Sequence, residues 1–112
     1  MTTQSILTSI KKMIGLDEEY EVFDPDIIAY INTAFVILNQ LGVGNLDEAF
    51  RIEGKEETWD DFGDYNSIEM IKSYIAKKVQ LMFDPPSSSA LLESTKNQIS
   101  ELEFRMTVGE EK

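Results

Sequence analysis

The sequence predicts an all-α fold of four helices in an up-down arrangement, with one long acidic loop between the second and third helices. Three observations lead to this fold class. Apolar residues recur every three or four positions in four segments, which is the spacing of one helical face. Glycine, proline and cap residues stand at the ends of these segments. The length of 112 residues suits a single domain spanning residues 1–112.

The first helix is expected over residues 5–14. Its apolar positions follow the helical spacing and are Ile6, Leu7, Ile10, Met13 and Ile14. Ser5 is the expected cap, because a serine oxygen can accept a hydrogen bond from a first-turn amide. Gly15 stands where a helix commonly ends.

The second helix is expected over residues 25–41, with Asp24 as its N-cap, Pro25 at its first position and Gly42 just after its end. One apolar stripe contains Ile27, Ile28, Ile31, Ala34, Phe35, Leu38 and Leu41. Tyr30, Val36 and Ile37 extend the apolar character to the other side. A helix that is apolar around so much of its circumference is central or contacts another subunit as well. These three residues are therefore a candidate oligomer face.

Residues 42–66 show no sustained helical period and form the long acidic loop. The stretch "FRIEGKEETW" is compatible with a small hairpin that turns near Gly54, because its apolar residues alternate with polar ones. The aromatic residues Trp59, Phe62 and Tyr65 indicate that the loop packs onto its own domain.

The third and fourth helices are expected over residues 67–83 and 88–107, followed by a frayed tail over residues 108–112. Ser67 is the expected N-cap of the third helix. The two apolar stripes are Ile68, Ile71, Ile75, Val79 and Met82 on the third helix, and Leu91, Leu92, Thr95, Ile99, Leu102 and Met106 on the fourth. Across the four helices, the residues expected in the core include Phe35, Leu38, Ile75 and Leu102.

The stretch "FDPPSSSALLES" between these helices predicts a stiff corner formed by Asp84, Pro85, Pro86 and Ser87. Pro85 disfavours helical torsion angles at the residue before it, so the third helix should end near Phe83. One of the serines at positions 87–89 is expected to cap the next helix. The short connection favours roughly antiparallel packing of the two helices.

The composition argues against catalysis and ligand chemistry. The chain has neither cysteine nor histidine, which excludes thiolate metal sites and Ser-His-Asp or Cys-His devices. The acids at positions 17–26 and 60–64 do not have the spacing of a calcium loop. We therefore expect no enzymatic activity, catalytic residue, cofactor or metal. No apolar run approaches the roughly 20 residues that span a membrane.

The net charge of −11 is unevenly distributed: residues 1–64 hold 14 acids and 4 bases, whereas residues 65–112 hold 7 acids and 6 bases. A strongly acidic half repels phosphates, so high-affinity binding of nucleic acid is not expected. Such a surface suits a protein past which DNA slides without sticking. It also fits an acidic regulatory or DNA-mimic protein that binds a nucleic-acid-binding partner, and this alternative stays open.

Three segments resemble the head–tail connector proteins (head-completion or adaptor proteins) of long-tailed phages and prophages. They are "ILTSIKKMIGLDEEYEVFDPDIIAYIN", "FVILNQLGVG" and "SIEMIKSYIAKKVQLMFDPPSSSALLESTKNQISELEFRM". The resemblance lies in the helix order and in stretches such as "LNQLGVG", and it includes no catalytic signature.

The resemblance implies a structural virion protein that forms a ring, usually of twelve subunits, below the portal protein. Such a ring joins the head to the tail, extends the DNA channel without specific DNA binding, and receives a stopper or tail-completion protein. The implied location is the head–tail interface of the virion, with the host cytoplasm as the site of assembly. In that setting the loop acids are candidates to line the channel or contact a neighbouring subunit; they are Glu53, Glu56, Glu57, Asp60, Asp61 and Asp64.

Overall fold

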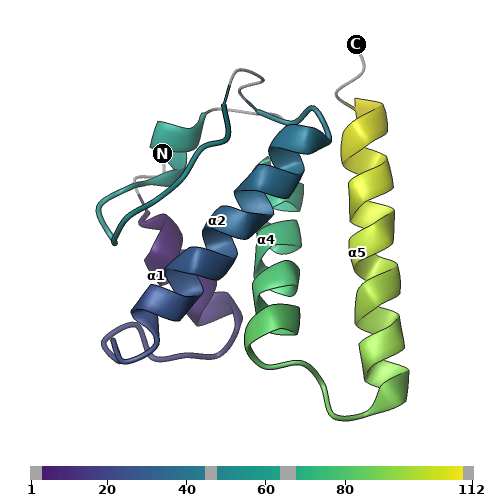
Figure 1. Ribbon diagram of the computed structural model, residues 1–112, viewed down its shortest axis with the longest axis horizontal. Helices are drawn as coiled ribbons and strands as arrows, with labels where there is room; N and C mark the ends of the chain where they lie inside the picture. Colours follow the sequence, from purple (N-terminus) through teal and green to yellow (C-terminus); the bar gives the residue numbers. More distant parts are fainter. Residues whose placement is uncertain (1–3, 45–47, 64–67, 110–112) are drawn as a thin grey trace.

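A computed structural model describes residues 4–44, 48–63 and 68–109 of the protein. The elements over these ranges are all helices: α1 (Ile6–Met13), α2 (Asp24–Gln40), α3 (Trp59–Phe62), α4 (Ile68–Phe83) and α5 (Ser89–Gly109). The all-α prediction is confirmed. The four expected helices are α1, α2, α4 and α5, and α3 is a single extra turn inside the predicted loop (Figure 1).

The predicted ends of α1 are confirmed. The Ser5 hydroxyl accepts a hydrogen bond from the Thr8 amide at 3.2 Å and so caps the first turn. Ile14 is the C-cap, and Gly15 follows it with a φ of 89°. A positive φ is easily adopted only by glycine, which explains why the helix stops at this position.

The predicted N-cap of α2 is wrong. Asp24 is the first helical residue, and Phe23 precedes it without a side-chain cap. The Asp24 carboxylate instead forms an ion pair with the Lys11 ammonium group at 2.8 Å. A tertiary contact has thus taken the carboxylate that the local sequence pattern assigned to the cap. At the other end, Gly42 follows the C-cap with a φ of 87°, as predicted.

The core lies between α2 and α4, which pack against each other, and α1 packs against both (Figure 1). Phe35, Leu38 and Ile75 are buried there, as predicted. The prediction for Leu102 is wrong, because this residue is only half-buried at the edge of the core. Its helix, α5, packs along α4 on the outer side of the molecule.

The C-terminal helix continues further than the sequence pattern indicated. Its α-helical hydrogen bonding runs to Gly109, whereas the predicted helix ended at residue 107. Its 21 residues correspond to a length of roughly 31 Å at 1.5 Å per residue. The rest of the predicted tail, residues 110–112, and the predicted cap Ser67 lie outside the described residues.

Candidate functional site

Residues 48–58 are fixed to the domain by two sets of polar contacts. The Asn32 side chain on α2 donates to the Ile52 carbonyl at 2.9 Å and accepts from the Ile52 amide at 2.8 Å. Further along, the Ile6 amide donates to the Glu57 carbonyl at 3.0 Å, and Ser5 and Thr58 form an isolated antiparallel bridge. The predicted hairpin is therefore wrong, because the backbone groups of its two arms bond to α2 and to the start of α1.

The short helix α3 closes this segment onto α1. Thr58 and Asp61 form a reciprocal capping box, in which each side chain accepts a hydrogen bond from the backbone of the other. Trp59 is buried, and its indole nitrogen donates to the Ser9 hydroxyl at 3.1 Å. The Lys72 ammonium group lies 5.4 Å from the centre of the indole ring, within the range of a cation–π contact.

The aromatic residues of the segment pack onto the domain, as predicted. The ring centroids of Phe50 and Phe62 lie 5.2 Å and 5.1 Å from that of Phe35, and 5.6 Å from each other. This three-ring cluster attaches the segment to α2. Tyr65, the other predicted contact, lies outside the described residues.

The acids of the segment fall into two groups. The Glu57 carboxylate accepts hydrogen bonds from the Glu53 amide at 2.9 Å and the Gly54 amide at 3.3 Å, which closes the turn between them. Asp61 is engaged in the capping box. Glu53, Glu56 and Asp60 are exposed, as Asp61 is, but their carboxylates take no part in this turn or in the capping box. Asp64, the sixth candidate acid, is outside the described residues.

We call residues 53–56 the acidic tip. The connection between α2 and α3, which contains this tip, extends to the edge of the molecule opposite α5 (Figure 1). Because Glu57 holds the turn from within, the Glu53 and Glu56 side chains point into solvent on a fixed backbone. The tip is therefore a pre-formed anionic projection.

The candidate oligomer face on α2 is divided between two environments. Tyr30 and Ile37 are half-buried and pack against the core. Val36 has 45% of its surface exposed and faces a depression of about 350 Å³ between α2 and the 48–52 stretch. Val36 is therefore the most exposed of the three residues.

A buried lysine, which the sequence pattern did not single out, organises the connection between α1 and α2. Lys11 is only 2% exposed, and its ammonium group donates to the carbonyls of Glu18 at 2.9 Å and Tyr20 at 2.8 Å. Its ion pair with Asp24 supplies the counter-charge at 2.8 Å. The buried ammonium group thus has two hydrogen-bond acceptors and one counter-ion, which offset the cost of burying a charge. In the sequence, the sign of this role was a lysine next to the apolar stripe of the first helix.

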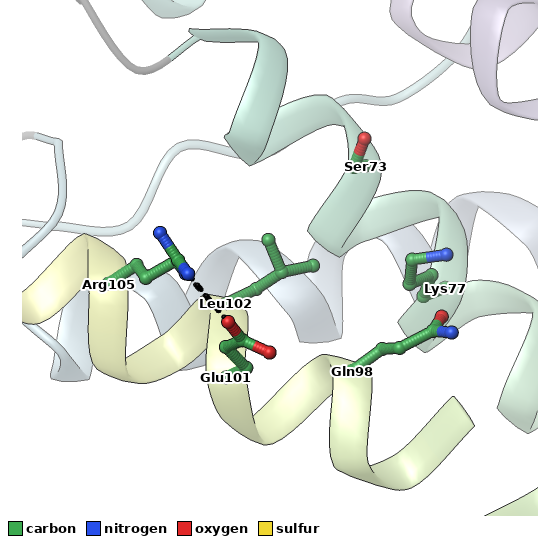
Figure 2. A pocket seen from close by; sticks show the side chains of 6 residues that line it. All are labelled: Ser73, Lys77, Gln98, Glu101, Leu102 and Arg105. Atoms are coloured by element: carbon green, nitrogen blue, oxygen red, sulfur yellow. Dashed lines mark hydrogen bonds and ion pairs between the residues drawn. The ribbon is translucent and has the colours of Figure 1, made fainter. Parts of the chain in front are cut away.

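A groove of about 390 Å³ runs between α4 and α5 (Figure 2). Its lining consists of Ser73, Lys77, Gln98, Glu101, Leu102 and Arg105. Figure 2 shows Leu102 pointing from α5 toward α4 between two polar ends. At one end Arg105 and Glu101 form an ion pair at 2.7 Å, and at the other Lys77 lies beside Gln98. The sequence pattern assigned no role to this groove.

The corner and one partly buried hydrogen bond hold α4 and α5 together in antiparallel packing (Figure 1). The helix α4 ends at Phe83 as predicted, and Ser88 caps α5 by accepting from the Leu91 amide at 3.3 Å. The corner residues Asp84, Pro85 and Ser87 are exposed, while Pro86 is half-buried.

The hydrogen bond between the two helices runs from Tyr74 to Glu103. The Tyr74 hydroxyl donates to the Glu103 carboxylate at 2.7 Å. Burial, reinforced by this bond and by the negative charge of Glu103, raises the pKa of Tyr74 well above its ordinary value.

Within the described ranges, no group of three or more acidic side chains is arranged to hold a metal ion. None of the helices in these ranges is long and apolar enough to cross a membrane. The geometry offers docking surfaces: an acidic tip, an apolar depression and a polar groove.

Comparison with known proteins gave one match. A family model described as "Phage connector protein" matches residues 6–112. Searches of curated proteins and of solved structures each found no match. The matched range contains all five helices and every described surface considered above. The chain therefore belongs to the phage connector protein family, a family of structural proteins that connect the phage head to the tail.

Proposed function

We propose that this protein assembles into a ring below the portal protein, extends the DNA channel and presents a surface to a stopper or tail-completion protein. Membership of the phage connector family is the observation that carries this proposal. The ring is usually twelve-fold in the head–tail connectors that the sequence resembles, and we adopt that number. The ring occupies the head–tail interface of the virion after assembly in the host cytoplasm.

The two edges of the subunit support a ring. A ring of identical subunits requires two different surfaces on each subunit, because head-to-tail contacts close into a cycle only when unlike surfaces meet. The acidic tip and α5 lie at opposite edges of the molecule (Figure 1). The half-exposed Val36 and the 68% exposed Phe104 add apolar contact area on α2 and α5.

The charge distribution supports a role in lining a channel through which DNA moves freely. Each phosphate neutralised by a lysine or arginine adds salt-dependent affinity, which would slow the passage of DNA. Residues 48–63 hold six acids and two bases, and their acids Glu53, Glu56 and Asp60 are exposed. Acids of this segment that do not contact a neighbouring subunit are therefore suited to line the channel.

Assembly with the portal protein tests the proposal. The purified chain is studied by light scattering after size-exclusion chromatography and by electron microscopy, alone and with its cognate portal protein. We expect a ring on the portal, and no ring with the portal protein of an unrelated phage as the control. A chain that stays monomeric and binds neither portal nor virions would overturn the proposal.

The alternative of an acidic DNA-mimic protein depends on charge and size alone, and family membership favours the connector. It predicts salt-sensitive capture of a basic host protein from lysate. Recovery of such a protein together with failure to bind the portal would favour the alternative instead.

A further inference from the structure

The ion pairs of the described residues leave an uneven set of charges without a partner. Three acids in the connection between α1 and α2 or at the start of α2 are paired with a lysine, in the pairs Glu18–Lys12, Glu21–Lys55 and Asp24–Lys11. On α4 and α5, Glu69 pairs with Lys72 and Glu101 pairs with Arg105. The charges left over are therefore the ones available to a partner.

The remaining charges include one group of acids in and before α3 and one group of lysines on α4 and α5. In residues 48–61, the exposed acids outside any ion pair of the described chain are Glu48, Glu53, Glu56, Asp60 and Asp61; other such acids are Asp17, Glu19 and Asp26 before and at the start of α2, and Asp84 and Glu93 at the corner and on α5. The basic residues outside any such ion pair are Arg51 and three lysines of α4 and α5, namely Lys77, Lys78 and Lys96. The three unpaired lysines thus lie on the two helices that form the groove, whereas the acids of residues 48–61 lie on a different part of the subunit.

One of these unpaired lysines, Lys77, lines the groove between α4 and α5, where it is half-buried (Figure 2). At the other end the Arg105 guanidinium group has a single carboxylate neighbour, Glu101, and keeps further N–H donors. A ligand suited to this groove carries a negative group at each end, with a small group between them that packs on Leu102 (Figure 2).

The acidic tip has this pattern. Its sequence Glu53-Gly54-Lys55-Glu56 places a carboxylate at each end, with glycine and lysine between them. The turn is already closed by the Glu57 carboxylate, so little order is lost when the tip docks. The tip and the groove helix α5 lie at opposite edges of one subunit, so the tip of one copy can reach the groove of the next (Figure 1).

We propose that the acidic tip of one subunit docks into the α4–α5 groove of a second copy of this chain, with Lys77 as the main ionic contact at one end of the groove. The contact is head-to-tail, since the two surfaces are different, and such contacts close into rings. This inference rests on the proposed ring function and assigns its subunit interface. Glu53 and Glu56 are subunit contacts in this arrangement, which leaves Asp60 and Glu48 for the channel.

Disulfide trapping tests the contact, because the chain contains no cysteine of its own. Glu56→Cys and Gln98→Cys are purified separately, mixed, assembled on the portal protein and oxidised. Both residues are exposed, so the substitutions leave the core untouched. We expect a disulfide-linked dimer in the mixture and none from either variant alone. Asn97→Cys is the matched control, because it is also exposed but lies about 100° around the helix from the groove.

The mixture with Gln98→Cys should yield about tenfold more linked dimer than the mixture with Asn97→Cys, because a disulfide requires Cβ atoms within roughly 3.5–4.5 Å. Rings that form without excess cross-linking over the control would overturn the inference and leave the ring function standing. Absence of both rings and cross-links on the portal would overturn both.

Charge reversal gives a second, independent readout. Lys77→Glu should raise the protein concentration needed for half-assembly by roughly three- to tenfold, because it replaces an attraction with a repulsion. Lys77→Arg should assemble like the wild type, and Lys78→Glu is the control for a change of net charge on the same helix. Equal effects of the two reversals would contradict a specific groove contact.

Discussion

Asn32 holds the acidic segment on α2, and its replacement by alanine should weaken both the fold and the presentation of the acidic tip. The amide side chain makes hydrogen bonds of 2.9 Å and 2.8 Å with the carbonyl and the amide of Ile52. Ile52 itself is fully buried. The substitution therefore leaves two backbone groups without their partners in a buried environment.

The expected loss follows from these two contacts. A buried group that loses its hydrogen-bond partner costs about 1–3 kcal/mol, and water entering the space vacated by the amide recovers part of this. We expect Asn32→Ala to lower the free energy of unfolding by about 2–3 kcal/mol. At roughly 3–6 °C per kcal/mol for a chain of this size, the melting temperature should fall by about 6–18 °C.

Urea denaturation followed by circular dichroism and by the fluorescence of Trp59 measures this loss. The matched control is Thr33→Ala, one residue further on, because the exposed Thr33 hydroxyl donates only to the Ala29 carbonyl of its own helix. That control should cost less than about 0.5 kcal/mol. Hydrogen exchange should also show faster exchange of the Ile52 amide in the Asn32 variant alone. Equal stability of the two variants would refute the argument.

Three other predictions concern the interior. Lys11→Met should lower the free energy of unfolding by about 3–5 kcal/mol, because the substitution leaves the Asp24 carboxylate and two carbonyls without their cation. Urea denaturation measures this loss, and a loss under about 1 kcal/mol would contradict the role of the lysine. Phe35→Ala should lower the free energy of unfolding by about 3–5 kcal/mol and Leu102→Ala by only about 1–2 kcal/mol, because Phe35 is buried and Leu102 is half-buried. A larger loss for Leu102→Ala than for Phe35→Ala in the same assay would contradict this description of the core. The raised pKa of Tyr74 means that the unfolded chain releases this proton near pH 10 while the folded chain retains it, so stability should fall as the pH rises above about 10. Denaturation from pH 8 to pH 11 should show a shallower fall for Tyr74→Phe, and parallel slopes would contradict the assignment.

Helix positions and several helix ends were predictable because their signals are local. The spacing of apolar residues located α1, α2, α4 and α5, and the glycines at positions 15 and 42 marked two helix ends. Pro85 correctly marked the end of α4, since it restricts the residue before it whatever lies nearby. These signals depend on residues within one or two helical turns, so they can be interpreted without knowing the tertiary structure.

The predictions that failed concern groups with a competing distant partner. Asp24 was expected to cap α2, but Lys11 lies 13 positions earlier in the sequence and takes its carboxylate. The expected hairpin did not form, because Asn32 on α2 supplies both hydrogen bonds to Ile52 from 20 positions away. A side-chain amide that replaces a strand partner leaves no periodic signal in the sequence.

In the candidate site too, features that depend on residue type were predictable and features that depend on tertiary contacts were not. Its acids were identified from charge alone, but the sequence could not separate the exposed Glu53 and Glu56 from Glu57, which is used inside the turn. The groove that contains Lys77 is formed by two helices and has no signature on either one.

The sequence alone determined the helical class, the stiff corner between α4 and α5, the acidic character of the first half and the resemblance to head–tail connectors. Each of these depends on residue type and short-range spacing. The tertiary structure decided which charges are paired within the described part of the subunit and which are not. That division depends on distances between side chains that are far apart in the sequence, and only the packing of α1, α2 and α4 sets those distances.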